Sequence, residues 1–254
     1  MTKIYLRLMT LSFLISLSCS DSDSPESGKI NEDGITDIKL LTSVVDDRGG
    51  ASFAKTIDIT YSNDLMQKFD GGGNEYNLEY NLDNKVDIVT DQFDEVLEFT
   101  YEGKRLKMIL DKYVDSAFNY DENGRIISVI ETIEGDNYNQ STYTTYDSKG
   151  NVISYRIGPE NSEDTSLYTF QFDDKINPFY SLWLKFGFFI DLEVNPYDIM
   201  PMNFKHNPIK IFENNVLKFD INYTYDKDGY PLSCGYTKYS SLGESYGTVL
   251  FTYL

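Results

Sequence analysis

Carboxylates are the side chains with catalytic potential that this sequence supplies in number. It has 41 Asp and Glu residues against 22 Lys and Arg, with one His and two Cys. Two carboxylates held about 5–10 Å apart can hydrolyse a glycosidic bond, but so many acidic residues form such pairs by chance. His206 is the only histidine, which argues against histidine-based triads and multi-histidine metal sites. We therefore expect no catalytic residues and no metal ligands, and a carboxylate-dependent hydrolase is the least favoured alternative.

Two acidic motifs look like the start of calcium-binding loops: Asp121-Glu122-Asn123-Gly124 and Asp226-Lys227-Asp228-Gly229. Both lack the further spaced ligands and the closing Glu of such loops. In a hairpin turn, the first Asp bonds the backbone two residues on, and Gly adopts the positive φ that closes the turn. We interpret both motifs as turns. No phosphate-binding or dinucleotide-binding glycine motif is present, so we expect no cofactor.

An aromatic unit recurs along the chain, in the form Tyr-x-Tyr or Phe-x-Tyr followed by a turn and a second apolar run. The final aromatic residues of these units lie at positions 61, 80, 101, 120, 146, 172 and 225. A spacing near twenty residues fits two strands and their two connections, so the repeats predict an array of hairpins.

The first run of each unit alternates aromatic with polar residues, as in 76–80 and 97–101. Such alternation indicates a sheet with one buried face and one hydrated face. We predict one all-β domain over residues 35–254: an antiparallel meander of repeated hairpins, strongly twisted and curled into a barrel or half-barrel. The alternating runs are mostly five to seven residues long, shorter than the roughly 9–11 residues of a membrane-spanning strand, which disfavours a transmembrane barrel.

The segment from 176 to 215 interrupts the repeat. It holds four prolines, the only Trp and the only His, and its centre is densely apolar. Residues 181–189 fit a short helix or a strand equally well. One interpretation is a ligand-facing aromatic platform that uses Tyr180, Trp183 and Phe186. The other, which burial of apolar residues favours, is a plug that fills the curled sheet.

The N-terminus has the layout of an export signal. Lys3 and Arg7 precede a short apolar run, and Ser18 precedes Cys19. This pattern resembles a bacterial lipoprotein signal, which implies a signal peptide over 1–18 and a lipid on Cys19; the alternative is an ordinary cleaved signal. Residues 19–34 then form an acidic tether, which resembles the surface-export signal of Bacteroidota lipoproteins or is a plain solvated linker.

The second cysteine, Cys234, has no intrachain partner if Cys19 carries the lipid. We therefore expect Cys234 to be a buried thiol.

The repeated motif Phe/Tyr-x-Tyr-Asp-x-x-Gly, followed by Arg or Asn and an apolar residue, resembles the YD repeats of Rhs-type proteins. The layout of residues 55–254, including Asn177-Pro178-Phe179-Tyr180 and His206-Asn207-Pro208, resembles a family of Bacteroidota lipoproteins of unknown function. That resemblance implies a porin-like β fold and an envelope location, and no activity.

The charge of −19 disfavours nucleic acid and anionic lipid as partners, because both are bound through clusters of Lys and Arg. We expect membrane contact through the lipid anchor only. The function that fits best is a non-catalytic binding or interaction module at the outer membrane, on the cell surface or facing the periplasm, with a glycan or an envelope protein as ligand. The alternative is a structural or envelope-assembly component.

Overall fold

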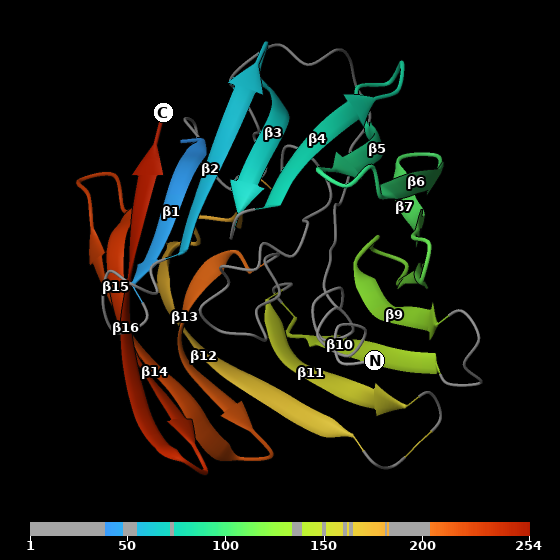
Figure 1. Cartoon of the computed structure of the whole chain (residues 1–254). Helices are drawn as coiled ribbons and strands as arrows, with labels where there is room; N and C mark the ends of the chain where they lie inside the picture. Colours follow the sequence, from blue (N-terminus) through green and yellow to red (C-terminus); the bar gives the residue numbers. More distant parts are fainter. Residues whose placement is uncertain are drawn as a thin grey trace.

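The computed structural model describes residues 39–47, 55–71, 74–133, 139–148, 151–159, 162, 165–180, 182 and 204–254. Within these residues, sixteen strands form one closed antiparallel barrel (Figure 1). The first eight strands are β1 (Leu41–Asp47), β2 (Lys55–Ser62), β3 (Leu65–Gly71), β4 (Asn74–Tyr80), β5 (Val86–Asp91), β6 (Val96–Glu102), β7 (Arg105–Leu110) and β8 (Val114–Tyr120). The others are β9 (Ile126–Ile133), β10 (Asn139–Tyr146), β11 (Val152–Pro159), β12 (Ser166–Ile176), β13 (His206–Glu213), β14 (Val216–Tyr225), β15 (Pro231–Ser240) and β16 (Gly243–Tyr253).

Each strand pairs with its neighbours in the sequence, and β1 pairs with β16 to close the ring. The predicted all-β meander of hairpins is confirmed, and the sheet closes into a barrel rather than a half-barrel. Among the described residues, no helix is long and apolar enough to cross a membrane.

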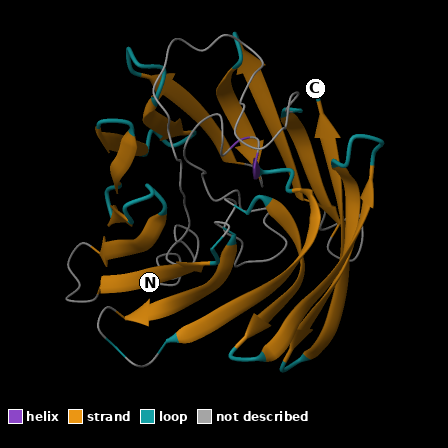
Figure 2. Ribbon diagram, turned by 180° about the vertical axis from the view of Figure 1, so that it is seen from behind, coloured by secondary structure: helices purple, strands orange, loops and turns teal. Residues whose placement is uncertain are grey.

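The inner face of the barrel is mainly apolar, although Asp46 and Glu131 are also buried. In β2, Ile57 and Ile59 are buried while Asp58 and Thr60 are exposed. The first strands of other hairpins, such as β4, β6 and β8, follow the same alternation, and the buried apolar residues of the barrel form one hydrophobic core. Figure 2 shows the strands encircling this interior, with loops and turns at the rims. Burial of the inward residues is the main force that curls the sheet.

In a meander, alternate connections lie at opposite ends of the barrel. One end carries the turns at 62–65, 80–86, 102–105, 120–126, 146–152 and 225–231. It also carries the start of β1, the C-terminus and the connection from β12 to β13. We call it the tyrosine end, for the reason given below.

The turns at this end follow the predicted chemistry. Asp121 Oδ1 accepts hydrogen bonds from the N–H groups of Asn123 and Arg125, at 2.9 and 2.8 Å. Gly124 has a φ of 79°, which suits glycine far better than other residues. The same bonds recur at Asp226, so both motifs that look like calcium loops are hairpin turns.

A tyrosine hydroxyl joins each regular hairpin to the one before it. The ladder between β5 and β6 ends at Ile88, two residues beyond Val86. Tyr101 Oη donates to the Val86 carbonyl oxygen at 2.8 Å, where no ladder bond is present. We call such a bond a tyrosine bridge. Equivalent bonds run from Tyr61 to Leu41, Tyr80 to Met66, Tyr120 to Leu106, Tyr146 to Ile126, Tyr223 to Pro208 and Tyr253 to Pro231.

Basic residues reinforce three of these bridges. Arg125 lies over the ring of Tyr146, with its guanidinium carbon 4.8 Å from the ring centroid. Lys85 and Arg105 lie in the same way over Tyr101 and Tyr120. In each case the tyrosine contacts two consecutive residues of the preceding hairpin, one through its face and one through its hydroxyl. The Arg in the motif Tyr-Asp-x-x-Gly-Arg therefore packs on the next repeat.

Part of the predicted insert belongs to the barrel. We expected the interruption to extend to Asn215, but β13 begins at His206, nine residues earlier. Pro208 obscures this strand in the sequence, and it is tolerated because it lies at a register shift near the start of the strand.

The described ends of the insert are buried. Phe179, Leu182 and Phe204 belong to the core, and the Phe204 ring lies 4.8 Å from the ring centroids of Phe170 and Phe172. The middle of the insert, where the plug and platform interpretations differ, lies outside the described residues.

Candidate functional site

The ring of tyrosine bridges has one gap, at Phe172. Ser154 pairs with Thr169, which places Phe172 at the position that a bridging tyrosine holds at every other junction between hairpins. A phenyl ring has no hydroxyl to donate. Phe172 packs on Phe204 instead. The regular framework therefore breaks where β12 leads into the connection to β13.

Asp173, directly after the gap, gathers hydrogen bonds from three segments. Its Oδ1 accepts from the N–H groups of Lys175 at 2.9 Å and Asn207 at 3.2 Å. The side-chain amide of Asn207 donates to both carboxylate oxygens, and Tyr225 Oη donates to Oδ2. Burial raises the pKa of Tyr225 well above its ordinary value, and the bond to Asp173 raises it further.

His206 precedes Asn207 in β13. It pairs with Ile176 across the ladder, and its Nδ1 lies 3.2 Å from the carbonyl oxygen of Lys175. A carbonyl oxygen can only accept, so Nδ1 carries a hydrogen. The Lys175 ammonium pairs with Asp174 at 3.1 Å.

Two fully buried asparagines complete the cluster. Asn177 donates its backbone N–H to the Lys205 carbonyl at 3.0 Å, and its Oδ1 accepts the N–H of Phe179 at 2.9 Å. Among the described residues, Asn177 Nδ2 and Asn207 Oδ1 have no hydrogen-bond partner, although both residues have an exposed fraction of 0%. We call Asp173, Asn177, His206, Asn207 and Tyr225 the amide site.

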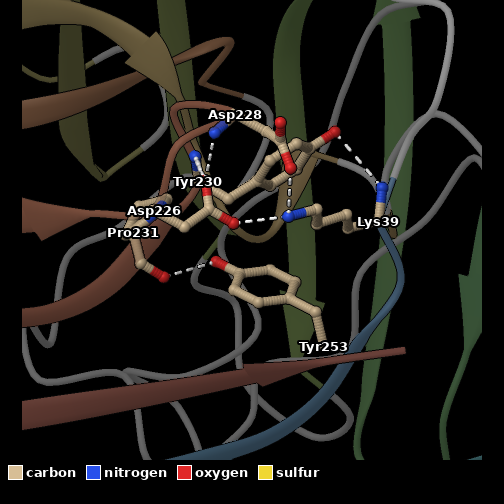
Figure 3. A network of polar contacts seen from close by, with 6 residues as sticks. All are labelled: Lys39, Asp226, Asp228, Tyr230, Pro231 and Tyr253. Carbon is tan, nitrogen blue, oxygen red and sulfur yellow. Dashed lines mark hydrogen bonds and ion pairs between the residues drawn. The ribbon is translucent and has the colours of Figure 1, made fainter.

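A second polar network lies close to the amide site (Figure 3). The Lys39 ammonium contacts Asp226 Oδ2 at 2.5 Å and Asp228 Oδ2 at 2.7 Å, and the Lys39 N–H donates to Tyr230 Oη at 3.2 Å. These bonds raise the pKa of Lys39 to about 12. Lys39 precedes β1, so the network fixes the start of the barrel to the last turn of the tyrosine end.

The two networks are neighbours. A Cβ added at Gly229 in the β14–β15 turn would lie 3.6 Å from Lys175 Cδ, so this turn packs against Lys175. The amide site and the Lys39 network therefore occupy one sector of the tyrosine end.

The hydrogen bonds of the amide site suit binding rather than catalysis. Asp173 already accepts from several donors, so its lone pairs are engaged and it is a poor general base. In the described part of the chain, no three His, Cys, Asp or Glu side chains come together as a metal site. The arrangement suits recognition of a neutral group by hydrogen bonds.

Comparisons with known proteins support the fold. No family model and no curated protein matches the chain. Among solved structures, the barrel is similar to a porin-like protein from Bacteroides uniformis ATCC 8492, with a TM-score of 0.60 and 13% identity. The match covers 84% of this chain and 96% of that chain. At this identity the likeness concerns the fold alone.

Two toxin structures match more weakly. TcdB2-TccC3 aligns with 78% of this chain and 10% of its own length, at 16% identity and a TM-score of 0.33. The Tc holotoxin pore of Photorhabdus luminescens aligns with 76% of this chain and 9% of its own, at 15% identity and a TM-score of 0.31. Scores this low carry no argument.

The predicted ligand-binding aromatics have different outcomes. Tyr180 is half-buried, packs against the core and donates its N–H to the Asn177 carbonyl at 3.0 Å. It therefore lies directly beside the amide site. Trp183 and Phe186 lie outside the described residues, as does Cys19. Cys234 is fully buried, as predicted.

Sequence reasoning missed Asp173, Asn207 and Lys39. Among 41 acidic residues, nothing marks Asp173 except that it follows the one bridging position occupied by Phe. The contrast between Phe172 and tyrosine elsewhere was the usable signal. Lys39 could not have been found, because its partners lie 187 residues away.

Proposed function

We propose that this chain is a lipid-anchored protein of the cell envelope whose barrel lies outside the lipid bilayer and is surrounded by water. In this proposal, the barrel is a non-catalytic binding module with its ligand site at the tyrosine end, and the lipid on Cys19 is its contact with the membrane. The ligand is a glycan or an envelope protein.

The polarity of the barrel wall is the observation that carries the proposal. A membrane-spanning barrel presents an apolar band to lipid and a polar interior. Here the order is reversed: in β6, Phe99 is buried while Glu98 and Thr100 are exposed. In β14, Ile221 is buried while Asn222 and Thr224 are exposed. Such a wall is favourable in water and costly in lipid.

The amide site supports binding rather than catalysis. Its carboxylate is engaged, and its histidine is held by a backbone carbonyl. Hydrogen-bonding groups convergent on a partly apolar site are what specific recognition of small ligands requires. The aromatic residue Tyr180 adjoins them.

An envelope-assembly role is the second candidate, and the outer face of three neighbouring strands favours it. Ile127 in β9, Tyr143 in β10 and Ile153 in β11 are 41%, 42% and 45% exposed. Exposed apolar residues on adjacent strands are typical of contacts with another protein.

The membrane attachment is tested with the full-length chain in its cellular host. Cys19→Ala should move the protein from the membrane fraction to the soluble fraction in detergent-free buffer, with its far-UV circular dichroism unchanged. Ser20→Ala, next to the lipidated residue, should leave it in the membrane fraction. A Cys19→Ala protein from which residues 1–18 have been cleaved, and which still stays in the membrane and needs detergent, would contradict a water-facing barrel.

The ligand class is tested in the same cells. Capture of the wild-type protein on a panel of envelope glycans, and crosslinking in intact envelopes, should separate a glycan ligand from a protein partner. Protease added to whole cells should remove the protein if it faces outward. A chain that neither binds a glycan nor crosslinks to an envelope protein would exclude both binding roles.

A further inference from the structure

The two unpartnered atoms of the amide site are a donor and an acceptor, and their identities follow from their neighbours. The Asn207 side chain bonds the Asp173 carboxylate, which only accepts, so the nitrogen faces Asp173 and the oxygen is left over. The Asn177 side chain bonds the Phe179 N–H, which only donates, so its oxygen faces Phe179 and its nitrogen is left over. Reversing either amide would break an existing bond.

The strand pairing places the two asparagines on one face. Ile176 pairs with His206, and Asn177 bonds Lys205, so Asn177 lies opposite Lys205. Asn207 follows Lys205 by two residues, and both asparagines have an exposed fraction of 0%, so both side chains face the barrel interior. Diagonal neighbours of this kind have Cα atoms about 7–8 Å apart. At the spacing of a regular ladder, one group between the two amide side chains could bond to both at about 2.9 Å.

A single bridging group must therefore accept a hydrogen bond from Asn177 Nδ2 and donate one to Asn207 Oδ1. A hydroxyl group does both, whereas a carboxylate cannot donate and an ammonium cannot accept. Buried polar atoms in folded proteins are almost always satisfied, by protein, ligand or ordered water.

We propose that Asn177 and Asn207 together bind one hydroxyl group. This inference rests on the proposed binding function and names the ligand class: a neutral saccharide or polyol, with water occupying the position in its absence. Tyr180 donates its N–H to the Asn177 carbonyl oxygen, and we assign its ring to stacking on the sugar.

The test uses the full-length protein with glucose, mannose, N-acetylglucosamine and myo-inositol as probes, and measures binding by calorimetry. Asn177→Asp keeps the acceptor for the Phe179 N–H and removes the donor, so affinity for the bound probe should fall at least tenfold. Asn222→Asp changes the charge equally on the exposed face of β14 and should bind as the wild type does. Unliganded melting temperature and circular dichroism show whether each variant is folded.

A double-variant cycle with Asn177→Leu and Asn207→Leu tests the bridge without any sugar. If one hydroxyl joins both side chains, the second substitution should lower the melting temperature much less than it does alone. Coupling between the two substitutions, together with no binding of any probe, would support the hydroxyl position and assign it to water. A bridging peak in a high-resolution density map would confirm that water. Additive losses would overturn the bridge.

The two proposals can fail separately. If Asn177→Asp is folded and binds a probe as tightly as the wild type, the binding function stands and the amide site is not its location. If the cycle shows coupling but no glycan or partner is ever captured, the hydroxyl position stands and the binding function falls.

Discussion

The tyrosine bridges show how one hydroxyl can change the role of an aromatic residue. Phe and Tyr bury similar rings, but only Tyr can satisfy a backbone carbonyl left beyond the end of a ladder. Seven junctions between hairpins use Tyr, and the eighth has Phe172. The amide site begins at that exception.

The bridge can be measured by removing one hydroxyl. Tyr101→Phe should leave the Val86 carbonyl without its hydrogen bond and lower the free energy of unfolding by about 1 kcal/mol. For a chain of this size, that corresponds to a fall of about 2–4 °C in melting temperature. Tyr143→Phe, on the exposed outer face of β10, is the matched control and should melt as the wild type does. Equal melting of both variants would contradict a stabilising bridge.

Alkaline pH should unfold the barrel. Burial raises the pKa of Tyr168 to about 12, and it raises the pKa of Tyr61, Tyr80 and Tyr101 well above the ordinary value near 10. Above pH 10 the unfolded chain loses these protons while the folded chain keeps them, so stability present below pH 10 is lost as pH rises. Tyrosinate absorbance and circular dichroism should change together between about pH 10 and 12. Ionisation near pH 10 without unfolding would contradict buried hydroxyls.

At the scale of strands, small residues decide how close two side chains can approach. Tyr236 in β15 pairs with Gly247 in β16, and its hydroxyl reaches Asp46 in β1 at 3.3 Å. This one side chain therefore crosses three strands at the seam that closes the barrel. A Cβ on residue 247 would lie 2.3 Å from Tyr236 Oη.

Gly247→Ala should therefore displace a buried ring. We expect a loss of about 1–3 kcal/mol in the free energy of unfolding, as for other overpacked cores. Gly235→Ala lies on the neighbouring strand, where an added Cβ meets no atom within 4 Å, and should be neutral or slightly stabilising. Chemical denaturation of both variants checks this. Indistinguishable midpoints would mean that the ring moves without cost.

Many of the turns and strands could be predicted from the sequence because they depend on local residue patterns. Turn chemistry at Asp121 and alternation around Phe99 depend on residues a few positions apart. The pairing of β1 with β16 and the convergence of Asp173 with Tyr225 depend on contacts across the chain, which periodicity does not encode. β13 was missed because Asn207-Pro208 looks like a break until the register shift is known.

In the whole barrel, the seam where β1 pairs with β16 is built like the other junctions between strands. β1 and β16 pair over most of β1, and the tyrosine bridges Tyr61–Leu41 and Tyr253–Pro231 flank them. The Leu254 N–H donates to the Leu40 carbonyl at 2.9 Å, so the two ends of the barrel chain are adjacent.

A circular permutant should therefore fold. Residues 39–254 joined end to end by a short linker, and opened in the β8–β9 turn between Asn123 and Gly124, keep every strand pair. We expect the circular dichroism of the unpermuted 39–254 fragment and a cooperative melt. If the fragment folds and the permutant does not, the order in which the hairpins form, rather than the final pairing, determines the barrel.

The position of Lys39 also sets how the barrel would bear force. The chain enters β1 at the tyrosine end, so tension on the N-terminal segment pulls along the axis of β1. Lys39 must first leave Asp226 and Asp228; the bonds of β1 to β2 and β16 are then loaded together in shear, rather than opened one at a time. A barrel held from this end is mechanically strong in the direction in which a tether would pull it.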